Sequence, residues 1–199
     1  MPRASSTSIR ALHGATLAML QQKTGFINLL KNRFGAGQSK QLYQQVCPIV
    51  GASIGQHIRH SMDHMELAIR MAGEYPNINN DEFHYDLRTR GGNDENDIDA
   101  AFHRIDSLSD FLLEEKENEG SALVESRPVD AFFMLTGDPT EFKVSTTTER
   151  ELAFSVHHAI HHMAMVKIIA VQSLEIGNDD LPPDFGRAPS TVAHDKGMI

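Results

Sequence analysis

The sequence has a single cysteine, Cys47, among 199 residues, so no internal disulfide can form. One lone cysteine fits a reducing compartment, and we expect a cytoplasmic protein. A run of about 18 apolar residues is also missing, which predicts that no helix spans a membrane. Basic residues are outnumbered, with 18 Lys and Arg against 27 Asp and Glu and a formal net charge of −9. Without a basic stripe to replace phosphate counterions, the chain is not expected to bind nucleic acid.

Acidic residues are absent from residues 2–10, a Ser- and Thr-rich stretch that contains Arg3 and Arg10. We expect a flexible N-terminus over residues 1–8. A mitochondrial transit peptide is the alternative, because such peptides are rich in Arg and Ser and poor in acids. The length predicts one domain, which we place at residues 9–177, followed by an irregular, proline-containing tail at 178–199.

Hydrophobic periodicity predicts four long helices, over about residues 9–34, 53–74, 95–119 and 148–175. Ser53 is a suitable N-cap for the second, and Thr148 with Glu151 forms a capping-box pattern at the start of the fourth. A long loop follows the second helix, and a small hairpin over about residues 123–144 precedes the fourth. We therefore expect an all-α fold, a four-helix bundle with one hairpin-like insertion.

Histidine is the residue type that stands out, because seven of the 11 histidines fall inside two short windows of the second and fourth helices. At 100° per residue, the three histidines of the second helix share the stripe that faces the bundle interior. The fourth helix offers two pairs with i,i+4 spacing, and periodicity does not choose between them because this helix is apolar almost all round. The seven are His57, His60 and His64, then His157 with His161 and His158 with His162.

Burying several imidazoles without partners costs a few kcal/mol each. A metal ion in the bundle core would take up the lone pairs and hold each ligand neutral, so the spacing favours a metal site. Imidazole ligands suit Zn²⁺, Ni²⁺, Fe²⁺ or Cu²⁺, and three of them with an open fourth position describe a catalytic type of centre. The alternatives are a hydrogen-bonded structural cluster and a pH-sensing cluster.

Four stretches of the chain carry a resemblance to a known family: SIGQHIRHSMDH (53–64), HYDLRTRG (84–91), TERELAFSVHHAIHH (148–162) and DFGRAPST (184–191). In these stretches the sequence resembles the DinB/YfiT-like superfamily of metalloenzymes, in a branch without an assigned reaction. The resemblance implies a four-helix bundle with one metal ion held by His60, His158 and His162. His57, His64, His157 and His161, together with Ser155, are then expected to orient the ligands or to substitute for one of them.

Members of this superfamily include thiol-dependent transferases and a maleylpyruvate isomerase that use low-molecular-weight thiols. The resemblance therefore implies a metal-dependent hydrolase or a low-molecular-weight-thiol transferase that acts on a small molecule, with the metal activating water or thiol. A non-catalytic metal-binding or sensing protein is the first alternative, and it predicts a site closed by a fourth protein ligand. A structural or interaction protein with a histidine network is the second.

Other residues enter the site hypothesis from their position. The loop after the second helix could hold acidic substrate groups, or an Arg–Asp network could pin it to the bundle. Its candidate residues are Tyr85, Asp86, Arg88 and Arg90. Phe185 of the tail is expected to dock on the bundle, where the tail would cover the mouth of the site. Because the apolar character of the fourth helix exceeds one stripe, we also expect a homodimer.

Overall fold

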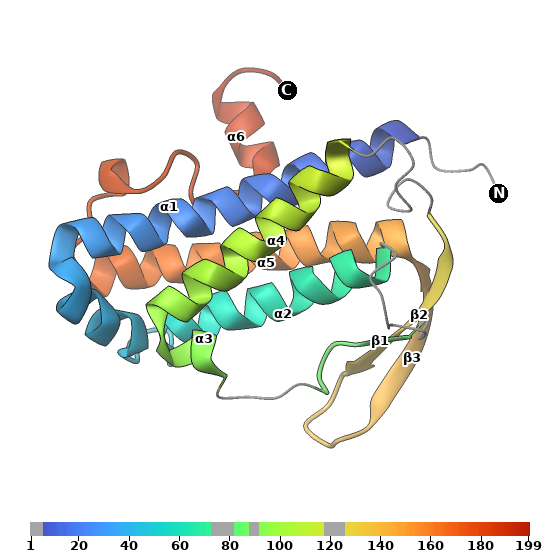
Figure 1. Ribbon diagram of the computed structural model, residues 1–199, viewed down its shortest axis with the longest axis horizontal. Helices are drawn as coiled ribbons and strands as arrows, with labels where there is room; N and C mark the ends of the chain where they lie inside the picture. The colour runs from blue at the N-terminus through green and yellow to red at the C-terminus, as the bar shows by residue number, and fades with distance from the viewer. Residues whose placement is uncertain (1–5, 73–81, 88–91, 118–125) are drawn as a thin grey trace.

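The structure is a computed structural model that describes residues 6–72, 82–87, 92–117 and 126–199. Four long helices lie side by side, and a small sheet closes one end of this helical layer (Figure 1). The first three elements along the chain are α1 (Ser6–Gln44), α2 (Ile54–Ala72) and β1 (Glu82–His84). They are followed by α3 (Asn93–Asn96), α4 (Ile98–Glu117), β2 (Pro128–Met134), β3 (Glu141–Thr147), α5 (Thr148–Ser173) and α6 (Pro189–Asp195).

The predicted helix boundaries have clear local causes. Gly35 has φ 73° and ψ 168°, so the first helix turns there, and a shorter helical stretch continues to Gln44. Ser53 caps α2 as predicted: its Oγ accepts from the Gln56 backbone N–H, and the Gln56 side chain accepts from the Ser53 N–H. The cap of α5 is one residue earlier than predicted, because Thr147 rather than Thr148 accepts from the Arg150 N–H.

The hydrophobic core lies between the four long helices, since each buries an apolar stripe against its neighbours. The sheet contributes a smaller part of the core, from the face that looks toward the helices. Among the most deeply buried side chains are Leu20, Phe26 and Ile27 of α1, Ile58, Met62 and Met65 of α2, Ile105 of α4, and Ala159 and Met163 of α5.

The sheet has the order β1-β2-β3 and is mixed. β2 and β3 form the expected antiparallel hairpin, with Phe133 opposite Phe142. β1 pairs parallel to β2, with Phe83 opposite Ala131 and His84 opposite Phe132. This strand lies in the stretch that the sequence led us to read as a long loop.

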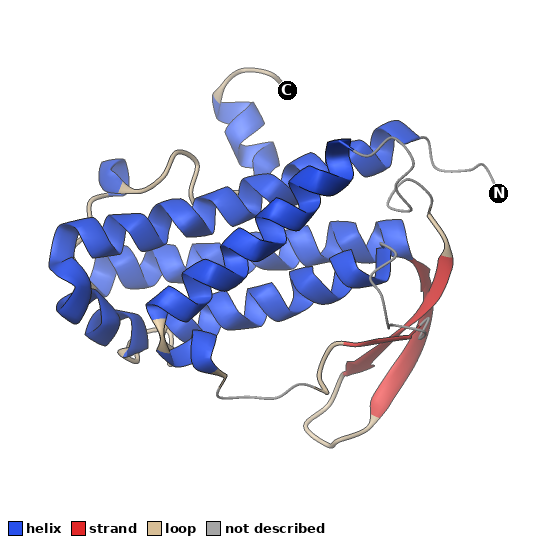
Figure 2. Cartoon of the chain, viewed as in Figure 1, coloured by secondary structure: helices blue, strands red, loops and turns tan. Residues whose placement is uncertain are grey.

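The expected all-α four-helix bundle is therefore wrong. Within the described residues the chain has six α-helices and a three-stranded mixed sheet (Figure 2). The DinB-like four-helix bundle that the resemblance implied is likewise unsupported. The reason for the miss is physical: β1 is only three residues long, and its pairing partner β2 follows after α3 and α4, so no local hydrophobic pattern reports the pairing.

The C-terminal segment packs on the helices rather than trailing from them. Phe185 is 1% exposed and its ring stacks on Phe26 with centroids 5.1 Å apart, as the sequence predicted. Gly186 has φ +64°, and a Cβ there would lie 2.7 Å from the Met163 carbonyl oxygen, so the tail touches the backbone of α5. A short 3-10 helix, Asn178–Asp180, and α6 lie on either side of this contact.

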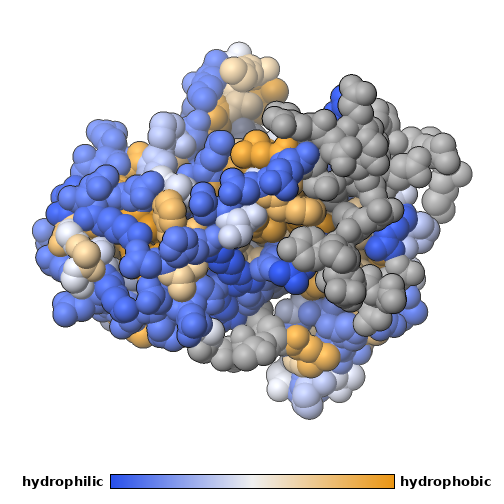
Figure 3. Space-filling model, viewed as in Figure 1, coloured by the Kyte–Doolittle hydropathy of each residue, from blue (hydrophilic) through white to orange (hydrophobic). Residues whose placement is uncertain are grey.

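The surface gives little further guidance on partners. The face seen in Figure 3 is largely hydrophilic over the helices, and apolar residues form separate patches. No helix in the described part of the chain is long and apolar enough to cross a membrane. The expected homodimer stays a prediction.

Candidate metal centre

The predicted histidine windows meet in the interior of the helical layer, because α2 and α5 pack against each other along their length (Figure 1). His60 and His64 are one turn apart on α2, and His158 and His162 are one turn apart on α5. One ring nitrogen from each of His60, His64 and His158 lies within 4.8 Å of the other two. These three side chains form a group that can hold a metal ion.

His162 joins this group through His158. The Nε2 atom of His158 lies 3.0 Å from Nε2 of His60 and 3.1 Å from Nε2 of His162. The ring of His64 stacks on the ring of His158, with centroids 4.1 Å apart. Four imidazoles from two helices thus converge, and we call His60, His64, His158 and His162 the histidine cluster.

Proton counting shows why a cation suits the histidine cluster. Each contact between neutral imidazoles needs one N–H and one lone pair. Nε2 of His158 takes part in two contacts but carries either a hydrogen or a lone pair. Neutral rings therefore leave a shared or repulsive contact among these three Nε2 atoms, whereas a metal ion would accept all three lone pairs.

The spacing of these nitrogens also fits a metal. Tetrahedral zinc with Zn–N distances of about 2.0–2.1 Å requires ligand nitrogens about 3.3 Å apart. The two Nε2–Nε2 distances at His158, 3.0 and 3.1 Å, are close to that value. An all-imidazole donor set is one that Zn, Ni, Fe and Cu ions accept.

Burial keeps His162 of the histidine cluster uncharged. His162 is only 9% exposed, and burial, reinforced by the neighbouring imidazoles of which His158 and His60 act most strongly, lowers its pKa to about 2. Burial also lowers the pKa of His57, with a further contribution from His161. Neutral imidazole is the form that binds a metal, so no proton has to be displaced from His162 at neutral pH.

Two aromatic side chains border the histidine cluster, Tyr85 just after β1 and Phe154 of α5. The Tyr85 ring stacks on His64 with centroids 4.7 Å apart, and Phe154 lies 5.7 Å from His158. The Tyr85 hydroxyl donates to Glu151 Oε2 at 2.8 Å, and Glu151 is fully buried. Burial and the Glu151 carboxylate both raise the pKa of Tyr85, so this hydroxyl stays protonated.

Glu151 is therefore not the capping-box residue that we expected, because Thr147 is the N-cap of α5. Besides Tyr85, its carboxylate accepts from Thr146 Oγ1 and from Arg150, each at 2.8 Å. No sequence pattern pointed to the pair Tyr85–Glu151, since Tyr85 directly follows β1 and Glu151 belongs to α5.

The remaining histidines of the two windows lie around the cluster. His157 and His161 of α5 are exposed, whereas His158 and His162 face α2. His57 of α2 contacts His162, with the two Nδ1 atoms 2.9 Å apart. The ligand set His60, His158 and His162 stays a prediction, but packing brings all three together, with His64 beside them.

The non-histidine candidates have local roles. Ser155 is buried and donates to the Leu152 carbonyl oxygen at 2.8 Å. Asp86 accepts from the Met134 backbone N–H at 2.8 Å, which ties the end of β1 to the hairpin. Tyr85 is 3% exposed and borders the cluster as described above. Arg88 and Arg90 lie outside the described residues.

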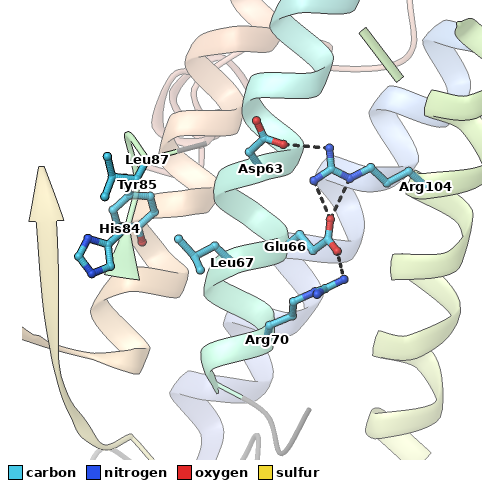
Figure 4. A pocket seen from close by; sticks show the side chains of 8 residues that line it. All are labelled: Asp63, Glu66, Leu67, Arg70, His84, Tyr85, Leu87 and Arg104. Atoms are coloured by element: carbon cyan, nitrogen blue, oxygen red, sulfur yellow. Dashed lines mark hydrogen bonds and ion pairs between the residues drawn. The ribbon is translucent and has the colours of Figure 1, made fainter. Parts of the chain in front are cut away.

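A cleft of about 300 Å³ that sequence reasoning missed lies beside the cluster, between α2, α4 and β1 (Figure 4). Arg104 spans it and is held by Asp63 and Glu66, and Arg70 pairs with Glu66 from the same helix. The carboxylates raise the pKa of Arg104 despite its burial. The cleft is lined by Asp63, Glu66, Leu67, Arg70, His84, Tyr85, Leu87 and Arg104.

Comparison with known proteins gives one partial match. A protein of Rhizopus delemar (strain RA 99-880) named FK506-binding protein 5 is 36% identical over 113 residues, which are 56% of this chain and 27% of that protein. The chain thus spans about a quarter of the relative's length. No protein-family model matches, and no solved structure matches. The resemblance to the DinB/YfiT-like superfamily stays a prediction.

Proposed function

We propose that this protein binds one divalent transition metal ion at the histidine cluster. The observation that carries the proposal is the convergence of His60, His64 and His158, whose ring nitrogens lie within 4.8 Å of one another in the helical interior. His60 and His158 belong both to this group and to the set that the family resemblance implies, so they are the core of the proposed ligand set. His64 and His162 complete it.

The number of bound histidines separates two functions. With three ligands, the fourth position is open, and a metal ion there supplies Lewis-acid chemistry to water or to a low-molecular-weight thiol. The protein is then a metal-dependent hydrolase or thiol transferase acting on a small molecule. With all four ligands the site is closed, and the protein binds or senses metal without catalysis. The ring nitrogen of His64 that lies within 4.8 Å of those of His60 and His158 favours this second function.

The relative's name describes binding of FK506 by that protein. We do not extend this activity to the chain, because nearly three quarters of the relative lies outside the match.

The test is elemental analysis of untagged protein purified without a metal column. We expect about one metal ion per parent chain, and its loss in the double variant His60→Ala/His158→Ala. His103→Ala, at an exposed histidine of α4, serves as the control and should keep the metal. A parent without metal after reloading with Zn²⁺, Ni²⁺ or Fe²⁺ would refute the proposal.

A second measurement separates the open site from the closed one. The parent is loaded with Co²⁺, and azide or 2-mercaptoethanol is added while the visible spectrum is recorded. An open position predicts a spectral shift that saturates with the added ligand. An unchanged spectrum, combined with metal loss in both His64→Ala and His162→Ala, supports four protein ligands and the non-catalytic function.

A further inference from the structure

His57 makes a contact that the proposed ligand set does not use. It lies about one turn before His60 on α2, and its Nδ1 atom is 2.9 Å from Nδ1 of His162. The other nitrogen of His162, Nε2, faces His158 at 3.1 Å. His162 therefore presents one ring nitrogen to the histidine cluster and the other to His57.

We propose that His57 fixes the tautomer of His162 by accepting a hydrogen bond from its Nδ1–H. The inference rests on the proposed function. A neutral imidazole carries one ring hydrogen, and a metal ion takes the lone pair of the nitrogen that faces it. With Nε2 of His162 turned to the metal, the hydrogen is on Nδ1. Among the described residues, the hydrogen-bond partner of this Nδ1 is Nδ1 of His57.

The surroundings explain why an imidazole has this role here. Ligating histidines usually donate their second N–H to a carboxylate, a backbone carbonyl or water. Two carboxylates on the same helices as the histidine windows are engaged elsewhere, Glu151 by Tyr85 and Thr146, and Asp63 by Arg59 and Arg104. His162 is nearly buried, so bulk water has little access to its Nδ1.

The opposite tautomer shows what His57 prevents. With the hydrogen on Nε2, His162 would point an N–H at Nε2 of His158, and its metal-binding lone pair would face His57 instead. Protein in that state has to change tautomer before it can bind metal through His162. A positioning residue at His57 therefore raises metal affinity without touching the ion.

The test compares His57→Phe with His57→Asn. Phenylalanine keeps a ring of similar shape but has no acceptor, whereas the asparagine amide oxygen can accept near the position of Nδ1. We expect His57→Phe to weaken Zn²⁺ binding about 10–100-fold, the usual effect of losing such a partner, and His57→Asn to restore most of it. His103→Asn, at the exposed histidine of α4, should bind like the parent.

A spectroscopic readout separates positioning from a general structural effect. In the Zn²⁺-loaded parent, ¹⁵N NMR of the imidazoles should show His162 protonated on Nδ1 and His57 unprotonated on Nδ1. Unchanged affinity in His57→Phe, or a His57 Nδ1 that carries the proton in the loaded parent, overturns the inference while leaving the metal site in place. A parent that binds no Zn²⁺ overturns the proposed function and this inference together.

Discussion

Replacing Lys23 by methionine should stabilise this protein, most strongly at and below neutral pH. Lys23 lies on α1 with its side chain fully buried, and its ammonium nitrogen donates to the sulfur of Met65 at 2.9 Å. A thioether is a weak acceptor and does not replace the hydration that a charged amine loses. Burial, with a smaller contribution from the charge of Arg104, lowers the pKa of Lys23 from 10.5 to about 7.

The size of the effect follows from proton linkage. Between pH 7 and pH 10.5 the unfolded chain binds the proton and the folded chain releases it, so the Lys23 contribution to stability rises with pH across this window. Integration of this shift gives a destabilisation of about 4 kcal/mol at pH 7 that falls to about 1 kcal/mol at pH 9.5. The parent should therefore gain about 3 kcal/mol relative to Lys23→Met between these two pH values.

The assay is urea unfolding of both proteins at pH 7 and pH 9.5. Packing differences between lysine and methionine are the same at both pH values, so they cancel in the comparison, and methionine keeps the length of the chain. Lys40→Met is the matched control, since Lys40 lies on the same helix with half of its side chain exposed. Parallel stability profiles for the parent and Lys23→Met would show that Lys23 does not release its proton in the folded state, and the reasoning would fail.

Three further predictions concern removal of the metal, the C-terminal segment at Gly186, and Tyr85 beside the histidine cluster. Removing metal with a chelator should lower the free energy of unfolding by about 2.7 kcal/mol relative to protein with free metal at 100 times its Kd, measured by denaturant titration. Gly186→Ala should destabilise the protein by about 2 kcal/mol or more, because φ is +64° and the Met163 carbonyl blocks the Cβ. Gly137→Ala is the control and should be nearly neutral in the same assay, because its Cβ would meet no atom within 4 Å. Tyr85→Phe should lower the free energy of unfolding by about 1–3 kcal/mol in a thermal melt, because the buried Glu151 carboxylate loses a hydrogen-bond donor. Unchanged metal content in this variant would show that the aromatic ring stacked on His64 is enough to hold that histidine in place.

Local patterns in the sequence account for the helices well. The Ser53 N-cap is a local feature and appears in the structure where it was expected. The first helix turns at Gly35, next to the predicted end of the range 9–34. The sequence did not predict the third strand of the sheet, because residues 82–84 gain their strand conformation only by pairing with β2. The N-cap of α5 also depends on tertiary contacts. Thr148 Oγ1 accepts a hydrogen bond from the Arg127 N–H, and Thr147 caps the helix instead.

The histidine cluster shows the same division between local and tertiary information. Spacing of four residues predicted two imidazoles on one face of each helix, and that is a property of any α-helix. Which pair of α5 faces α2 depends on packing, since exposed His157 and His161 have the same spacing as His158 and His162. The place of His64 depends on Tyr85, a residue of a segment whose path the sequence did not predict. A metal site of this kind therefore depends on two features. Helical spacing places the donor histidines on one face of each helix, and Tyr85 after β1 holds His64 in place.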